Sequence, residues 1–214
     1  MLLRGESAAA GYVGELRLEQ PIFDFEKKLA YSQGFRLGND LETLHSLIDG
    51  CIDVVKTNIE IDKTGIDYIA ALRGGAQIRI DSKTREAGCS QYWQNGEPEF
   101  APEIWSVMPG GKYKIARESA KTGWTLNESK ATDYIFCTFD PVDTDRVYFL
   151  PFQLYRMAFR RNLAIWREYH KVSIQDSGSW QSMCIFVPAG VVLNAIYIEM
   201  EAWRKLKQLE LTFS

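Results

Sequence analysis

Two short strand-like runs joined by a glycine turn constrain the fold of this chain more than any other feature. Residues 76–83 alternate around Ile78 and Ile80, which is the period-two pattern of a half-buried strand. Residues 67–72 form a second run just before them, and the Arg-Gly-Gly sequence at 73–75 is typical of a hairpin turn. The pattern predicts two neighbouring antiparallel strands in one sheet.

The charged residues of these two runs are the candidate functional group. If the strands pair, the carboxylates of Asp67 and Asp81 converge at one end of the sheet, and Lys83 shares a face with Asp81. Two close carboxylates repel one another, and Mg²⁺ is held in proteins by one or two carboxylates with waters and phosphate oxygens. The group therefore suits a metal that acts on a phosphodiester, although solvated side chains at a strand end fit the same residues.

Length and composition indicate an ordinary globular protein. The chain has 214 residues, of which 46% are hydrophobic and 25% charged. It contains no apolar run of about 18 residues, so we expect no transmembrane helix and no membrane partner. Arg4 and Glu6 stand where a signal peptide needs an apolar stretch, and we therefore expect a cytoplasmic location.

Cysteine and histidine usage argues against a zinc site or a disulfide framework. The chain has only two histidines, and its cysteines are far apart with no C-x-x-C pair. Buried thiols are the favoured interpretation. The cysteines are Cys51, Cys89, Cys137 and Cys184.

The net charge is unevenly distributed. The total of −3 and the pI of about 5.5 weigh against a protein that covers nucleic acid without sequence specificity, because such proteins are usually strongly basic. Residues 151–171, however, carry five basic side chains and one acidic one, a local charge of +4. This segment is either a basic groove or the solvated face of one helix.

The rest of the chain predicts helices and strands around a long irregular segment. Residues 1–20 have little pattern and are expected to form a mobile arm. Residues 88–130 are rich in Gly, Pro and Trp, and their tryptophans either anchor an insertion to the core, which we favour, or offer stacking surfaces to bases. We expect helices over 23–31, 41–48, 152–166 and 189–203, a short one over 127–131, and further strands over 51–56, 133–139, 146–150 and 183–188.

This order of elements, with one acid at the start of the second strand and Asp-x-Lys on the third, resembles the PD-(D/E)xK nuclease superfamily, the restriction-endonuclease-like fold. The resemblance implies an α/β protein with a mixed sheet and an αβββαβ core over residues 22–165. That core would lie in a single domain, 21–214, with an insertion at 88–130 and a C-terminal strand–helix extension at 166–214. Ile66 stands where the family carries a proline.

The resemblance also implies roles for individual residues. Asp67 and Asp81 would bind Mg²⁺ or Mn²⁺, with the main-chain carbonyl of Ser82 as a third ligand. Lys83 would position the attacking water and the scissile phosphate. Many family members add a glutamate from the first helix.

Further candidates follow from the same resemblance. Glu26 is the first candidate for the helix glutamate and Glu42 the second. Arg85 either contacts phosphate or is solvated. The arginines expected to engage the DNA backbone are Arg156, Arg160 and Arg161.

The predicted function is that of a metal-dependent deoxyribonuclease that hydrolyses DNA phosphodiester bonds. A catalytically inactive nuclease-fold protein, such as a DNA-binding or phage accessory protein, is the alternative, and a purely structural interaction protein is a third interpretation. The chain contains neither G-x-S-x-G nor a P-loop motif that would indicate other chemistry. A homodimer is plausible because cutting both strands usually needs two sites. We also expect, on general character alone, a phage or mobile-element origin.

Overall fold

The computed structural model describes residues 40–62, 64–85, 88–110, 112–113, 119–139 and 146–213. The expected arm at 1–20, the expected helix at 23–31 and the candidate Glu26 lie outside these ranges. The described chain opens with a helical segment over residues 40–47, close to the expected helix at 41–48.

The central sheet is mixed and has five strands, which confirms the expected α/β class. Its order is β1-β2-β3-β7-β8, with β3 and β7 parallel and every other neighbouring pair antiparallel. Gly74 and Gly75 make the β2–β3 turn with φ values of 95° and 87°, a region open to glycine. The strands are β1 (Cys51–Lys56), β2 (Tyr68–Leu72), β3 (Gln77–Thr84), β7 (Tyr134–Phe139) and β8 (Arg146–Pro151).

The segment expected to be irregular instead contributes to a second sheet. Strands β4 (Glu99–Phe100), β5 (Glu103–Val107) and β6 (Lys121–Thr122) join β9 (Lys171–Asp176) and β10 (Gln181–Pro188) from the C-terminal region. Strand β10 pairs with β4, β5 and β9, all antiparallel. The insertion and the C-terminal extension are therefore one structural unit, although strands of two to five residues are too short to show a period in the sequence.

Short helices complete the described chain. The helix expected over 127–131 is wrong: the Asn127 side chain accepts hydrogen bonds from the Ser129 amide and hydroxyl, which favours a turn over a helix. The short elements are α2 (Ile59–Asp62) and the 3₁₀ helices η1 (Cys89–Tyr92) and η2 (Gln94–Gly96).

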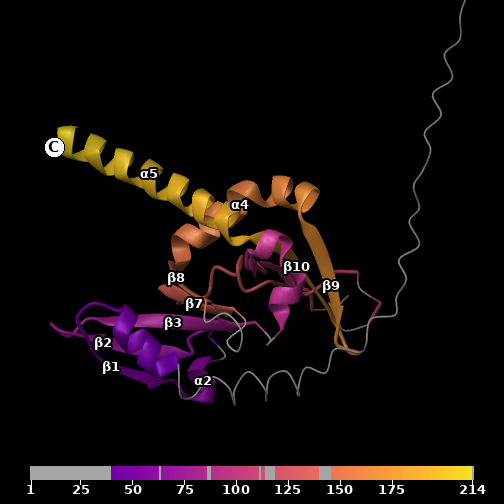
Figure 1. The fold of residues 1–214 in the computed structure, drawn as a ribbon, viewed down its shortest axis with the longest axis horizontal. Coiled ribbons are helices and arrows are strands. Elements are labelled where there is room, and N and C mark those ends of the chain that lie inside the picture. Colours follow the sequence, from indigo (N-terminus) through magenta and orange to yellow (C-terminus); the bar gives the residue numbers. More distant parts are fainter. Residues whose placement is uncertain are drawn as a thin grey trace, which may run out of the picture.

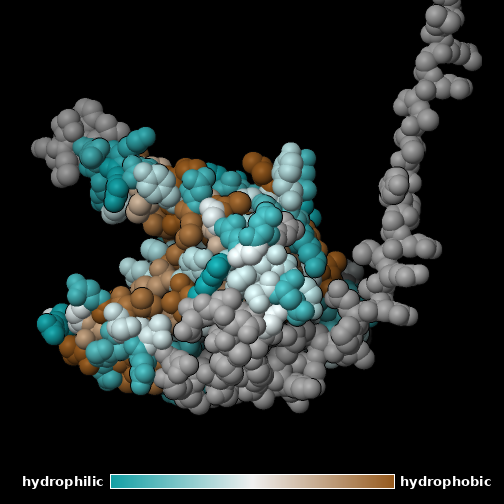
Figure 2. All heavy atoms as spheres, in the orientation of Figure 1, coloured by the Kyte–Doolittle hydropathy of each residue, from teal (hydrophilic) through white to brown (hydrophobic). Residues whose placement is uncertain are grey.

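Two long helices pack against each other, and the first of them also packs on strands β7 and β8 of the central sheet. Helix α4 (Phe152–Tyr169) follows β8 directly and buries Phe152, Tyr155, Phe159 and Trp166, as its helical spacing predicts. Helix α5 (Ala189–Phe213) packs beside α4 at its start and then extends away from the body (Figure 1). Apolar side chains gather in the hollow between α5 and the central sheet (Figure 2). No described helix is both long enough and apolar enough to cross a membrane.

Strand β7 separates two hydrophobic clusters on the two faces of the central sheet. Ile135 and Cys137 belong to the cluster beneath α4, whereas Phe136 belongs to the cluster that contains Leu44 of the helical segment 40–47. The near-continuous apolar run is thus a strand buried on both faces. Because β3 pairs with β7 in register, Asp81 lies beside Ile135 and Lys83 beside Cys137, both on the α4 face.

The tryptophans of the insertion anchor it to the core, as favoured. Trp93, Trp105 and Trp124 are partly buried against the cluster beneath α4. Trp124 stacks on Tyr155 with ring centroids 6.0 Å apart and an interplanar angle of 3°. The four cysteines are free thiols, and all except the partly buried Cys89 are buried.

Candidate metal centre

The structure brings Asp67 and Asp81 together at one edge of the hairpin. The pairing of β2 with β3 ends at Tyr68 and Ile80, so Asp67 and Asp81 are the next residues of the two chains at this edge. The Ser82 amide also donates to Asp67 Oδ2 at 2.6 Å. The two carboxylates therefore share one small region of the sheet.

Main-chain hydrogen bonds hold Asp67 in this position. Its amide donates to the carbonyl of Ile80 at 2.8 Å, and its carbonyl accepts from the Thr57 amide at 2.9 Å. These two bonds tie Asp67, which directly precedes β2, to β3 on one side and to the residue after β1 on the other. The side chain therefore starts from a backbone that is hydrogen-bonded on both sides.

Asp81 has an unusual electrostatic environment. It is only 2% exposed, and Lys83 Nζ lies 2.5 Å from its Oδ1, whereas its Oδ2 is buried and has no hydrogen-bond partner among the described residues. Burial raises the pKa of Asp81, Lys83 lowers it in part, and the charge of Asp67 raises it again. A buried carboxylate oxygen with no donor, beside a second carboxylate, is a position that a cation would satisfy.

A second lysine, which the sequence did not indicate, also lies at this centre. The Lys130 side chain crosses Gly65 so closely that a Cβ on Gly65 would overlap Lys130 Nζ and Cδ. Burial lowers the pKa of Lys130, while the nearby charges of Asp81 and Asp67 raise it. Lys130 is the last residue of the insertion, and its only sequence signal is the glycine two residues before Asp67.

The acid of the helical segment 40–47 that faces the sheet is Asp40. Its Oδ2 accepts from the Tyr68 hydroxyl at 3.1 Å and from the Ser82 hydroxyl at 3.4 Å. Glu42 is exposed, so this candidate has no place at the centre. Because Ser82 and Asp81 are neighbours on β3, their side chains point to opposite faces, and Asp40 fixes Ser82 from the far side of the sheet.

The protein ligands for a cation at this centre are thus two carboxylates. In the described ranges, no three or more His, Cys, Asp or Glu side chains lie close enough together to hold a metal ion. Two carboxylates still match the usual protein contribution to a Mg²⁺ site, in which waters and phosphate oxygens supply the other ligands.

The helix arginines have different surroundings from those expected. Arg156 is buried and donates to the carbonyls of Thr125 at 3.2 Å and Asn127 at 2.8 Å. Its guanidinium therefore holds the loop after Trp124 and is not exposed to DNA, which corrects the expected contact with the DNA backbone. Arg160 is exposed and donates to Glu128 at 2.8 Å.

The two remaining arginine candidates stay at or near the surface. Arg161 is exposed and lies 3.0 Å from the buried Glu199 of α5, so it links the two long helices. Arg85 follows β3 directly, and its guanidinium lies 4.8 Å from the centroid of the Phe186 ring. Of the four predicted DNA contacts, Arg85 is the one beside Lys83 in the fold.

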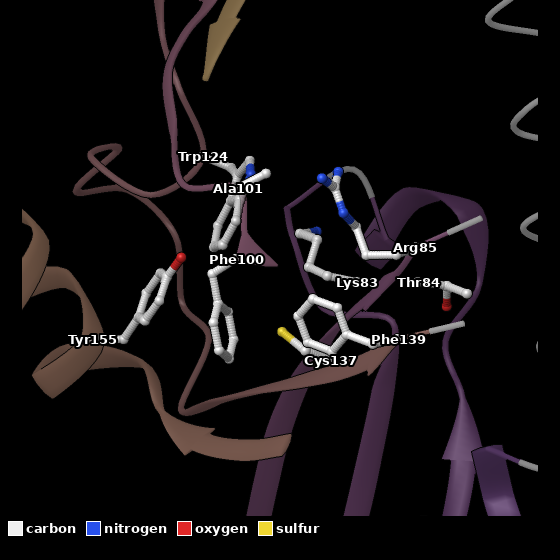
Figure 3. A pocket seen from close by; sticks show the side chains of 9 residues that line it. All are labelled: Lys83, Thr84, Arg85, Phe100, Ala101, Trp124, Cys137, Phe139 and Tyr155. Atoms are coloured by element: carbon white, nitrogen blue, oxygen red, sulfur yellow. The ribbon is translucent and has the colours of Figure 1, made fainter. Parts of the chain in front are cut away.

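A cavity of about 190 Å³ opens next to Lys83, between β3, β7, α4 and the insertion. Lys83 and Arg85 lie on one side of it, and Trp124, Phe100 and Tyr155 on the other (Figure 3). The Lys83 ammonium is 5.0 Å from the centroid of the Trp124 ring. The other residues that line the cavity are Thr84, Ala101, Cys137 and Phe139.

No protein-family model, no curated protein and no solved structure matches this chain. Any functional conclusion therefore comes from the sheet topology and from the geometry of the residues around Asp81.

Proposed function

We propose that this protein is a metal-dependent deoxyribonuclease of the PD-(D/E)xK type. The observation that carries the proposal is the buried Asp81 carboxylate, which contacts Lys83, lies within reach of the charge of Asp67 and has one oxygen that no described residue donates to. The order of the sheet also supports it, because the hairpin that bears both acids adjoins a parallel strand. The described part of the β3–β7 connection departs from an αβββαβ core, because it holds short strands and 3₁₀ helices in place of an α-helix.

The residues present fit a Mg²⁺ or Mn²⁺ ion. Asp81 Oδ1 accepts from Lys83, and Asp67 Oδ2 accepts from the Ser82 amide. Among the described residues Asp81 Oδ2 has no donor, so it is the first oxygen that we would assign as a metal ligand. The main-chain carbonyl of Ser82 remains the proposed third ligand. When bound, such an ion stabilises charge on the phosphate and makes a coordinated water more acidic.

The two lysines, Lys83 and Lys130, would have different roles toward the substrate. Lys83 reaches Asp81 and also lines the open cavity, so its ammonium is placed between the carboxylates and any phosphate that enters. A lysine acts there as a point charge that holds a phosphate oxygen or orients a water. Lys130 would add a second positive charge at the edge of the site formed by Gly65.

Plasmid cleavage tests the proposal. Supercoiled DNA is incubated with wild type, Asp81→Ala or Lys83→Ala in Mg²⁺, Mn²⁺ or EDTA, and Asp53→Ala, which removes an exposed carboxylate of β1, serves as the control. We expect wild type and the Asp53 variant to nick DNA only with metal, and the other two variants to be inactive. Equal nicking by all four proteins would mean that another site or a contaminant is responsible.

The second candidate is a nuclease-fold DNA-binding protein without catalysis, such as a phage accessory protein. Ile66 in place of the family proline and the net charge of −3 favour it. Calorimetry with Mn²⁺ separates the two, because an inactive protein should give no heat that depends on Asp67. Cutting both DNA strands usually needs two sites, so the proposed nuclease would act as a homodimer, located in the cytoplasm. Sedimentation in the presence of DNA measures the oligomeric state directly.

A further inference from the structure

The cavity beside Lys83 has an apolar part and a charged part. Its inner walls are aromatic, with Phe100 and Tyr155 almost fully buried, whereas its rim carries the cations of Lys83 and Arg85 (Figure 3). A ligand that satisfies both must have a flat apolar part and an anionic part within a few atoms of one another. A nucleotide, with its base and its phosphate, has this form.

The size and rigidity of the cavity restrict the ligand further. Its volume of about 190 Å³ is below the roughly 300–1,000 Å³ of pockets for drug-sized ligands, so it suits one ring system. Trp124 is held by its stack on Tyr155, and its amide donates to Glu103 at 3.0 Å. Arg156 donates a hydrogen bond to the Thr125 carbonyl and so fixes the loop that follows Trp124. The walls are therefore set before any ligand arrives.

Lys83 connects this cavity to the candidate metal centre. Its ammonium contacts Asp81 Oδ1 at 2.5 Å and faces the Trp124 ring at 5.0 Å. A phosphate held at the carboxylates would thus have the cavity as its neighbour on the side of Arg85. The base next to the scissile phosphate is then the group that comes closest to the aromatic walls.

We propose that this cavity binds a single nucleobase turned out of the stack next to the phosphate being cut. The inference rests on the proposed nuclease function and names its substrate class: DNA whose target base is unpaired or easily extruded. In a continuous duplex, extrusion must break pairing and stacking, and this penalty is least for mismatched or single-stranded bases. Mismatches, flaps and single strands should therefore be cut faster than matched duplex.

The first experiment measures binding of deoxyadenosine monophosphate in EDTA, so that no cleavage is required. Tryptophan fluorescence or calorimetry compares this nucleotide with deoxyribose 5-phosphate, which lacks the base. We expect the nucleotide to bind at least about tenfold more tightly, since stacking of one base contributes on this scale. Equal affinities would show that the site recognises phosphate alone and would overturn the inference.

Variants then localise the binding. Arg85→Gln changes a side chain at the rim with little risk to folding, and Trp124→Leu removes an aromatic wall; both should weaken nucleotide binding several-fold. Trp105→Leu, a partly buried tryptophan of the same insertion outside the cavity, is the matched control. Binding unchanged in Arg85→Gln, with Trp124→Leu either unchanged or unfolded, would place the nucleotide elsewhere and reject the proposal.

A cleavage arm separates this inference from the nuclease proposal itself. Oligonucleotide duplexes that differ by one mismatch are cut with Mn²⁺, and we expect cleavage beside the mismatch at about tenfold the matched rate or more. Equal rates on both duplexes would support the proposed nuclease and contradict the proposed binding of a base in the cavity. Nucleotide binding that depends on Arg85, without any cleavage, would support the cavity and refute the nuclease.

Discussion

Replacing Asp81 with asparagine should have opposite effects on stability with and without metal. Burial raises the pKa of Asp81 in the folded protein. A carboxyl group with a raised folded-state pKa contributes stability that is complete below its unfolded pKa of about 3.9 and is lost as the pH rises through the folded value. At neutral pH the metal-free wild type has lost this stability, whereas Asp81→Asn keeps a neutral side chain of nearly the same shape.

The expected size follows from the burial and from the partner. The Lys83 side chain is 34% exposed, so losing this ion pair should matter less than removing a charge from a site that is 2% exposed. A buried acceptor that lacks a donor costs about 1–3 kcal/mol, and more when it is charged, so neutralising Asp81 should recover stability on this scale. At the lower end this raises the Tm of metal-free Asp81→Asn by about 2–4 °C for a chain of this length.

Metal should reverse the ranking. With Mn²⁺ at about 100 times its Kd, wild type gains about 2.7 kcal/mol, equivalent to roughly 5–11 °C in Tm, and Asp81→Asn gains almost none. Differential scanning calorimetry in EDTA and in Mn²⁺ measures both effects, with the exposed Asp53→Asn as control. The reasoning is refuted if Asp81→Asn melts below wild type in EDTA, or if Mn²⁺ raises the Tm of both proteins equally.

Three further predictions concern other parts of the structure. Lys130→Met should lower single-turnover cleavage by about ten- to a hundredfold while folding persists, because a cation near the developing charge is lost; unchanged rates would leave Lys130 a structural role only. The Cys137 thiol, whose pKa burial raises to about 12, should react with thiol reagents far more slowly at about pH 8 than in the unfolded chain, and faster as pH rises toward that pKa. Arg156→Gln should lower the free energy of unfolding by about 1.5–3 kcal/mol, and the exposed Arg160→Gln by less than about 0.5 kcal/mol, as urea titrations would report; similar losses would mean that the buried bonds of Arg156 contribute little.

The central sheet was predictable because its strands are long and locally patterned. Strand β3 begins at Gln77, one residue after the expected start, and β1 matches its expected bounds. The proximity of Asp67 and Asp81 also follows from local information, since a two-glycine turn fixes the register of a hairpin. In such a hairpin, residues distant by fourteen positions become neighbours with no need for tertiary detail.

What the sequence could not predict depends on contacts between distant segments. Strands β4 and β6 have two residues each and form only because β10 and β5 offer edges for pairing. Lys130 reaches the centre through close packing over Gly65, which no periodicity records. Arg156 has the spacing of a surface cation, yet the insertion loop folds over it and takes up its donors.

The most direct test of the proposed centre is a crystal soaked in Mn²⁺ and measured by anomalous diffraction at the manganese edge. We predict one strong peak about 2 Å from carboxylate oxygens of both Asp67 and Asp81. Lys83 Nζ should lie beside these ligands without binding the metal itself. The same crystal form of Asp81→Asn should lack that peak. No peak between these carboxylates in the wild type, or a peak that persists in the variant, would contradict the account.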